Sequence, residues 1–334
     1  MEKLLEIKNL ETAFRIKDDY FNAVDKVSLD LYRNEVLAIV GESGCGKSTL
    51  ATTIMRLHNE NLTKSTGEII FKGKNILDLT EDEMNKIRTK DIGMIFQDPL
   101  SSLNPLHRIG KQIEEALIYH TELSAEERQK RVIELLTQVG IPNPERCAKQ
   151  YPHELSGGMR QRVMIAMAMS CKPSVLIADE PTTALDVTIQ AQILDLVKGL
   201  QEEMHAGIIL ITHDLGVVAE MADRVAVLYA GEVVEIGTAE QIFKNPQHPY
   251  TRSLLRSIPQ LDDEDASDDL YVIQGMVPSL KTLDRQGCRF ADRIPWVKDE
   301  HHEHNPTLHE VEEGHHVRCT CHRNFEFKGE ENNA

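Results

Sequence analysis

Residues 36–50 read VLAIVGESGCGKSTL, which is an apolar run, then a glycine-rich loop, then the start of a helical pattern. The loop matches G-x-x-x-x-G-K-[ST], the pattern of a phosphate-binding loop that follows a buried strand and opens a helix. Glycines let successive backbone N–H groups curl around phosphates, and the helix N-terminus adds a partial positive charge. The stretch therefore predicts nucleotide binding by Gly41, Glu42, Ser43, Gly44, Cys45, Gly46, Lys47, Ser48 and Thr49.

Two residues of this loop and two acids further along have predicted chemical roles. Lys47 is expected to neutralise the β- and γ-phosphates, and the Ser48 hydroxyl to ligate Mg²⁺. A second apolar run, residues 175–178, leads into Asp179 and Glu180. Adjacent acids at a strand end are often only a solvated loop. Downstream of a phosphate loop, however, Asp179 fits a magnesium anchor and Glu180 a general base for the attacking water.

Short β-rich runs alternate with helical periodicity before residue 260, which indicates an α/β fold with a mainly parallel core sheet. Strands are predicted at residues 4–14, 27–32, 36–40, 67–72, 92–96, 175–178, 208–212 and 224–228. Apolar stripes at helical spacing comprise Ile109, Ile113 and Leu117, and then Val132, Leu135, Leu136 and Val139. Residues 99–170 have almost no strand character, so we expect a helical insertion there.

The composition excludes several classes of protein. The chain has 334 residues, of which 41% are hydrophobic and 27% charged, and a net charge of −17, which disfavours nucleic acid as a partner. No apolar run reaches the roughly 18 residues of a membrane-spanning helix, and the N-terminus lacks a secretory pattern. Six cysteines in such a chain suggest reduced thiols. We therefore expect a cytoplasmic protein that reaches a membrane through partners.

Three further motifs accompany the phosphate loop. Residues 155–162 read LSGGMRQR, so that Ser156, Gly157 and Gly158 open a helical run and offer a second anion site. Gln97 follows the apolar run IGMIF, the segment ALD ends at Asp186, and His213 follows IILIT. Together and in this order, the motifs resemble those of ATP-binding cassette (ABC) ATPases over roughly residues 4–245.

The resemblance implies a fold and a set of roles. The ABC fold has an antiparallel β subdomain at its N-terminus and an inserted helical subdomain, here about residues 99–170. Glu180 and His213 are implied as the catalytic base and its positioning partner, while Ser48, Gln97 and Asp179 are implied as the Mg²⁺ ligands. Two such domains pack head to tail, so Ser156, Gly157, Gly158 and Asp186 are implied to serve a nucleotide shared with a partner. An aromatic side chain stacks on adenine, and Phe14 is the first candidate and Tyr20 the second.

Other stretches resemble one branch of the family, the ATPase subunits of oligopeptide and dipeptide importers. They are QDPLSSLNP from Gln97, YPHEL from Tyr151, ADEPTTALDVTIQAQIL from Ala178, NPQHPYT from Asn245, GMVP from Gly275 and GCRF from Gly287. The implied function is ATP hydrolysis that energises oligopeptide import, with dipeptide or nickel import as the alternative. A soluble ABC protein acting on ribosomes or DNA is disfavoured by the single phosphate loop and the acidic charge, and a P-loop kinase leaves Ser156 and His213 unexplained.

The resemblance also implies domains and partners. Residues 1–259 are expected to form the nucleotide-binding domain and residues 260–334 a C-terminal extension. Expected partners are a second ABC ATPase subunit, two membrane permease subunits and an extracytoplasmic substrate-binding protein, with no nucleic acid. The chain is expected to be peripheral on the cytoplasmic face of the membrane, with its permease contact near residues 99–113. The sequence permits either a homodimer or, as the resemblance favours, a heterodimer.

The C-terminal extension is acidic and rich in histidine and cysteine. It holds −9 of the net charge, including an acidic run at residues 262–269, together with seven of the fourteen histidines. Some relatives carry four cysteines there, spaced for an iron–sulfur cluster, but this chain keeps only Cys288 and Cys319 and has Ile294 and, approximately, His301 at the other positions. A zinc site is an alternative, with ligands drawn from Cys288, Cys319, Cys321 and one of His301, His302 or His322. We expect histidine-rich surface loops without a metal.

Overall fold

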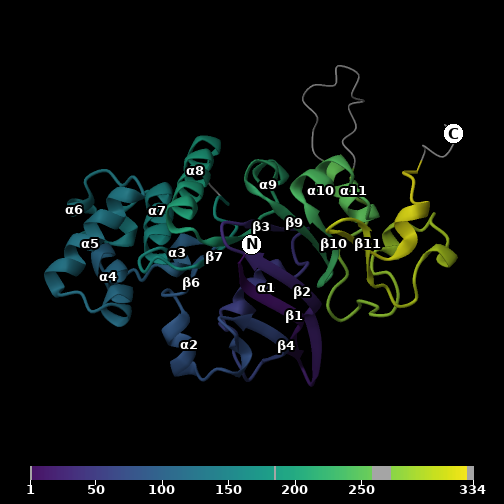
Figure 1. Ribbon diagram of the computed structural model, residues 1–334, viewed down its shortest axis with the longest axis horizontal. Coiled ribbons are helices and arrows are strands. Elements are labelled where there is room, and N and C mark those ends of the chain that lie inside the picture. Colours follow the sequence, from purple (N-terminus) through teal and green to yellow (C-terminus); the bar gives the residue numbers. More distant parts are fainter. Residues whose placement is uncertain (1, 184–185, 258–271, 329–334) are drawn as a thin grey trace, which may run out of the picture. The chain divides into compact units, whose positions relative to one another are not determined.

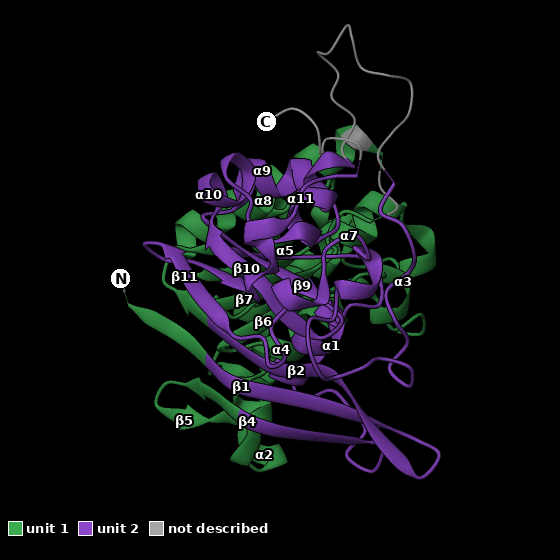
Figure 2. Cartoon of the chain, turned by 90° about the vertical axis from the view of Figure 1, so that its right-hand side faces the viewer, with its two compact units in different colours: residues 1–6, 30–36, 68–211 green, residues 7–29, 37–67, 212–334 purple. Residues whose placement is uncertain are grey.

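The computed structural model describes residues 2–183, 186–257 and 272–328, and the chain divides into two compact units (Figure 2). Unit 1 comprises residues 1–6, 30–36 and 68–211, and unit 2 comprises residues 7–29, 37–67 and 212–334. The acidic run at residues 262–269 and the first two residues of the ALD motif, Ala184 and Leu185, lie outside the described residues.

Three parallel strands form the sheet of unit 1: β6 (Ile92–Ile95), β7 (Val175–Asp179) and β8 (Gly207–Ile211). The strand β7 lies in the middle, with Ile95 beside Ala178 on one side and Asp179 beside Ile211 on the other. All residues of the three strands are buried, as expected for parallel strands covered on both faces. The three corresponding sequence predictions are confirmed, and Glu180 directly follows the carboxyl end of β7.

Helices make up most of the remainder of unit 1. They are η1 (Ile76–Asp78), α2 (Glu81–Ile87), α3 (Pro99–Ser102), α4 (Ile109–His120), α5 (Ala125–Gln138), α6 (Pro144–Cys147), η2 (Pro152–Glu154), α7 (Gly157–Ala168) and α8 (Val187–Met204). The two predicted apolar stripes lie on α4 and α5 and are buried. A reciprocal capping box between Ser124 and Glu127 fixes the start of α5.

The N-terminal sheet has the order β2-β1-β4-β5. Its strands are β1 (Lys3–Ile16), β2 (Asp19–Tyr32), β4 (Thr63–Phe71) and β5 (Lys74–Asn75). Lys17, in the two-residue connection between β1 and β2, has a φ of 60°, the left-handed conformation that tight antiparallel hairpins use. β4 and β5 also pair antiparallel, with Phe71 beside Lys74. The antiparallel N-terminal subdomain implied by the resemblance is confirmed.

A second set of strands belongs to unit 2, of which β3, β9, β10 and β11 are labelled in Figure 1. β3 (Val36–Val40) is parallel to β9 (Arg224–Tyr229), and β10 (Glu232–Thr238), β12 (His315–Arg318) and β11 (Leu308–Glu312) continue antiparallel from β9. The helices and turns of unit 2 are α1 (Lys47–Ile54), α9 (Leu215–Met221), α10 (Ala239–Lys244), α11 (Pro249–Arg256), η3 (Ala291–Arg293), η4 (Asp299–His301) and η5 (Thr320–Asn324). The antiparallel strands β10, β11 and β12 were not predicted, because charged and histidine side chains interrupt their apolar pattern.

Residues 272–328, hereafter the C-terminal segment, pack onto the rest of unit 2 through an aromatic cluster. The ring of Tyr229 lies 4.6 Å from that of Tyr250 and 5.2 Å from that of Phe290, measured between centroids. Further apolar side chains of the segment, Ile294 and Phe325 among them, join this core. None of the described helices has the combination of length and apolar character that crossing a bilayer demands.

Candidate functional site

The phosphate loop, residues 41–49, depends on two glycines that contact backbone from other parts of unit 2. Gly41 has a φ of 152°, and a Cβ atom there would lie 2.2 Å from the carbonyl oxygen of Leu228. Gly46 has a φ of 110°, and its Cβ would lie 2.5 Å from the carbonyl oxygen of Ala23. Any larger residue would force these backbones apart, so the glycines of the motif are required by packing as well as by conformation.

Lys47 begins helix α1 and folds back over the loop. Its Nζ donates to the carbonyl oxygens of Gly41, at 2.6 Å, and Glu42, at 3.0 Å. The first N–H groups of a helix have no partner within it, and the N-cap residue Gly46 has no side chain to cap them. A cation and the partial positive charge of a helix N-terminus are the elements of an anion site, so this end of α1 suits a phosphate.

The remaining predicted loop residues divide into exposed and buried ones. Ser43, Gly44 and Ser48 are exposed, and Thr49 is partly exposed. Cys45 is 1% exposed, and burial raises the pKa of its thiol. Ser48 therefore lies at the surface of the loop, whereas Cys45 packs inside it.

Two side chains from later in the sequence form hydrogen bonds with Glu42 of the phosphate loop. The sequence analysis did not identify either of them as functional. The hydroxyl of Tyr250 accepts a hydrogen bond of 2.7 Å from the backbone N–H of Glu42. The guanidinium of Arg293 binds the Glu42 carboxylate through both oxygens, at 2.6 and 3.2 Å. NPQHPYT, which contains Tyr250, was used only as a marker of the family branch, and no spacing rule connects Arg293 with Glu42.

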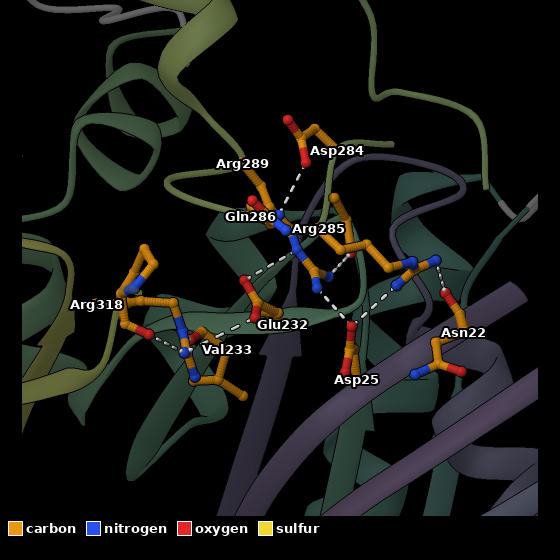
Figure 3. A network of polar contacts seen from close by, with 11 residues as sticks. Asn22, Asp25, Glu232, Val233, Asp284, Arg285, Gln286, Arg289 and Arg318 are labelled. Atoms are coloured by element: carbon orange, nitrogen blue, oxygen red, sulfur yellow. Dashed lines mark hydrogen bonds and ion pairs between the residues drawn. The ribbon is translucent and has the colours of Figure 1, made fainter. Parts of the chain in front are cut away.

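The C-terminal segment also forms a larger ion-pair network through arginines that precede Arg293 (Figure 3). The nearly buried carboxylate of Asp25 accepts from Arg289, at 2.5 Å, and from Arg285, at 2.9 Å. Arg289 is also 3.2 Å from Glu232, which in turn lies 3.8 Å from Arg318. Burial works to raise the pKa of Asp25, but the hydrogen bonds and charges of the two arginines outweigh it and lower the pKa. The C-terminal segment is thus fastened by charge to β2, the strand that contains Asp25.

In unit 1, the structure brings Gln97 and Glu180 together. The side-chain nitrogen of Gln97 donates to Glu180 Oε2 at 2.9 Å, and the Thr183 hydroxyl donates to the same oxygen at 2.8 Å. Glu180 has a φ of 48°, which is uncommon for a residue with a side chain and typical of functional positions. The preceding Asp179 is 5% exposed at the end of β7. Thr183 was not predicted, although it lies within the quoted ADEPTTALDVTIQAQIL stretch.

The predicted signature residues open helix α7 in unit 1. Ser156 is the N-cap, and its hydroxyl accepts from the N–H of Met159 at 3.3 Å. Ser156 and Gly157 are exposed, and a Cβ on Gly157 would meet nothing within 4 Å. Asp186 caps the next helix, α8, where it accepts from Ile189 N–H at 3.0 Å. Both caps leave a helix N-terminus at the surface, as a site shared with a partner requires.

His213 and the candidate adenine-stacking residues belong to unit 2. His213 is exposed between Thr212 and Asp214, and the Thr212 hydroxyl accepts from the Asp214 N–H at 3.0 Å. Phe14 on β1 meets the His58 ring edge-on at 5.1 Å. Tyr20 has the Lys64 ammonium 4.0 Å above its ring.

Oxygen donors are available for Mg²⁺ among the predicted ligands. Ser48 contributes a hydroxyl, Asp179 a carboxylate and Gln97 an amide oxygen, because the Gln97 nitrogen is the atom that donates to Glu180. Hydroxyl, carboxylate and amide oxygens are the hard ligands that Mg²⁺ prefers. Each donor is thus of a kind that suits Mg²⁺; Gln97 and Asp179 lie in unit 1 and Ser48 in unit 2.

Two family models match the chain. One, described as ABC transporter, matches residues 24–183, and one described as oligopeptide/dipeptide transporter, C-terminal region, matches residues 234–300. The oligopeptide transport ATP-binding protein OppD of Lactococcus lactis subsp. cremoris is 54% identical over 98% of this chain and 96% of that protein. The dipeptide transport ATP-binding protein DppD of Bacillus subtilis is 53% identical over 88% of each chain.

A solved structure is similar over the cassette. It is the dimer of the ATP-binding cassette MJ0796 in a post-hydrolysis state with ADP and Pi, with a TM-score of 0.64 and 34% identity. The similarity covers 71% of this chain and 99% of that chain. The fold class expected from the sequence is therefore confirmed.

Proposed function

The chain belongs to the ATP-binding proteins of peptide ABC transporters, and on that premise we propose that it hydrolyses ATP to drive oligopeptide import through a membrane permease. ATP hydrolysis is supported by the phosphate loop, where Lys47 and the first turn of α1 offer a site for an anion. The peptide half rests on the match of residues 234–300 to the C-terminal region of oligopeptide and dipeptide transporters.

The proposed mechanism assigns a chemical role to each residue of the site. Lys47 neutralises the β- and γ-phosphates, and Glu180 accepts a proton from the attacking water. Gln97 and Thr183 donate to one Glu180 oxygen, which orients the carboxylate. His213 helps to position the water, and Phe14 stacks on adenine. Ser48, Gln97 and Asp179 would hold Mg²⁺, which would supply charge neutralisation for the transferring phosphoryl group.

Two exposed helix N-termini and two exposed leucines support contacts with partner subunits. Ser156, Gly157 and Asp186 lie at the surface, which supports their use on a nucleotide shared with a second ABC ATPase subunit. Leu100 is 59% exposed and Leu106 80% exposed, both a few residues after Gln97. A contiguous exposed apolar patch marks an interaction site, and these two leucines would form part of one. We place the contact with two permease subunits at residues 99–113, with the chain peripheral on the cytoplasmic face and an extracytoplasmic protein delivering the peptide.

The test is uptake of a labelled oligopeptide, a labelled dipeptide and labelled nickel by cells that lack this chain. The cells are complemented with wild type, with Glu180→Gln, or with Glu122→Gln as a control at an exposed acid in the loop before α5. We expect wild type and the control to restore oligopeptide uptake and Glu180→Gln to fail. Uptake of nickel alone would move the chain to the metal-importing alternative with its ATPase role intact, whereas no dependence of any solute on the chain would contradict the importer function.

A further inference from the structure

Four side chains of the C-terminal segment converge on one point. The sulfur atoms of Cys288, Cys319 and Cys321 and a ring nitrogen of His302 all lie within 4.8 Å of one another. They come from three separate stretches: Cys288 from the loop before η3, His302 from directly after η4, and Cys319 and Cys321 from the junction of β12 with η5 and from η5 itself. Cys319 and Cys321 are fully buried, and Cys288 and His302 are partly buried. Three thiols and an imidazole gathered from distant sequence are a typical set of metal ligands.

The hydrogen bonds around these side chains are compatible with a bound metal: the Cys319 sulfur accepts from the Glu303 N–H at 3.3 Å, a bond that a metal-bound thiolate can keep. Both ring nitrogens of His302 are shielded from solvent without a hydrogen-bond partner among the described residues, and one of them lies within 4.8 Å of the three cysteine sulfurs. The six cysteines of the chain are all free thiols. A buried imidazole with no partner is costly and calls for a missing bonding partner. His322, by contrast, uses Nδ1 on the Cys319 carbonyl oxygen at 2.8 Å.

We propose that Cys288, His302, Cys319 and Cys321 bind one zinc ion. A zinc–sulfur bond of about 2.3 Å places the ligand atoms of a tetrahedral site about 3.8 Å apart, so a largest separation of 4.8 Å needs only a small contraction. An iron–sulfur cluster holds several irons between its cysteines and requires wider spacing. Of the positions where cluster-bearing relatives are expected to have cysteine, Ile294 packs in the apolar core and His301 lies outside the group.

Four protein ligands fill the coordination sphere of zinc, which makes this a structural site rather than a catalytic one. The segment has little other regular structure, because its described residues hold two short strands and three single turns. Cys288 precedes Arg289, which binds Asp25, and Arg293, which binds Glu42, follows five residues later. The ion therefore fixes the loop from which both arginines reach the region of the phosphate loop. Cys288 and His302 also line a surface hollow, which gives the ion a way in.

The sequence analysis expected histidine-rich surface loops without a metal; the structure contradicts the surface-loop part, because several of these side chains are buried. The side chains of Cys319, Cys321 and His315 are fully buried, and His315 bonds Glu235 at 2.8 Å. The choice among His301, His302 and His322 could not be made from sequence, because all three lie near cysteines along the chain. The proposal concerns the folded segment itself and does not depend on the transport function.

The first experiment measures zinc, iron and acid-labile sulfide in the full chain, purified without a histidine tag. We expect one zinc per chain and no iron or sulfide. His302→Ala and Cys321→Ser should lower zinc occupancy at least tenfold, while His301→Ala and Cys171→Ser, controls outside the group, should leave it unchanged. Iron with sulfide, zinc below a tenth of an equivalent, or full zinc retention in both ligand variants would overturn the proposal.

A second experiment guards against variants that merely misfold. His302→Cys keeps four ligands, so it should retain one metal per chain, and Co²⁺ substituted for zinc should show tetrahedral absorption with stronger thiolate-to-cobalt bands than in wild type. Removal of zinc by a chelator should lower the thermal midpoint of wild type, and adding zinc back should restore it. Octahedral cobalt spectra that are the same in wild type and His302→Cys would overturn the site, as would a midpoint that does not respond to chelator.

Discussion

Arg293 and Glu42 lie 251 residues apart in sequence and form a two-oxygen ion pair, with the shorter contact, Nη1 to Oε2, at 2.6 Å. Arg293 belongs to the C-terminal segment and Glu42 to the phosphate loop. The Arg293 side chain is 4% exposed and that of Glu42 29%, so the guanidinium is shielded from water while the carboxylate is partly exposed. A bidentate pair of this kind is both stronger and more directional than a single ion pair. The C-terminal segment therefore determines the shape of the loop that meets ATP.

Arg293→Gln is expected to weaken ATP binding. The variant removes the charge and one of the two contacts to Glu42, which loosens the loop backbone. We expect the KM for ATP to rise about tenfold, equivalent to about 1.4 kcal/mol, with a smaller effect on kcat. Steady-state ATPase assays test this, with Arg323→Gln, at an exposed arginine of the same segment, as the control. Equal KM values for the two variants would contradict the role of Arg293.

Tyr250→Phe removes the acceptor for the Glu42 N–H without changing the packing of the ring. The N–H group is left without its partner, which costs about 1–3 kcal/mol when the group stays dry. We expect a lower thermal midpoint that ATP partly restores, because nucleotide binds only the folded loop. Tyr119→Phe, at a tyrosine that is 77% exposed, is the matched control and should melt with wild type.

Much of the fold and of the nucleotide site could be predicted because local signals carry them. The strand before Gly41, the loop motif and the acids after β7 are short patterns in which neighbours in sequence are also neighbours in space. The contacts of Tyr250 and Arg293 with Glu42 could not be predicted, because they join segments more than 200 residues apart. The strand β10 was missed for a different reason. A glutamate in a sequence is usually taken as exposed, but Glu235 is buried and forms a hydrogen bond with the equally buried His315.

Gln97→Glu is expected to slow ATP hydrolysis. The substitution keeps an oxygen ligand for Mg²⁺ but replaces the N–H donor to Glu180 with a second carboxylate. A like charge nearby raises the pKa of the Glu180 carboxyl, and the lost hydrogen bond acts in the same direction. We expect kcat to fall about tenfold or more and the acid limb of the pH–rate profile to move to higher pH. Gln138→Glu, at an exposed glutamine on α5, should leave both unchanged.

Leu106→Glu tests the proposed permease contact. Leu106 is 80% exposed, so a charge there should not disturb the fold of this chain, yet it should prevent an apolar side chain from docking on a partner. We expect peptide uptake in complemented cells to fall to background while the ATPase activity of the isolated chain is kept. Leu62→Glu, at a leucine that is 51% exposed, should support normal uptake. Loss of uptake in both variants would point to a general effect of added charge.

Asp25→Asn tests the network that fastens the C-terminal segment to β2. The variant removes the charge that Arg289 and Arg285 share, and the free energy of unfolding should fall by about 2 kcal/mol, as for a lost hydrogen bond between charged groups. Glu232 still faces Arg289 at 3.2 Å, which keeps the loss below that of an unpaired buried charge. Asp18→Asn, at a carboxylate whose side chain is 98% exposed, is the control.

The same pair of variants predicts a pH dependence. The two arginines hold the pKa of folded Asp25 below its ordinary value of 3.8, so its contribution is fully present above that pH and is lost as the pH falls through the folded value. The stability gap between wild type and Asp25→Asn should therefore be constant at neutral and mildly acidic pH and shrink below 3.8. Denaturant unfolding at a series of pH values measures this gap. A gap that widens at low pH would mean that Asp25 is not held ionised by the arginines, and the network would then be stabilised by packing instead of charge.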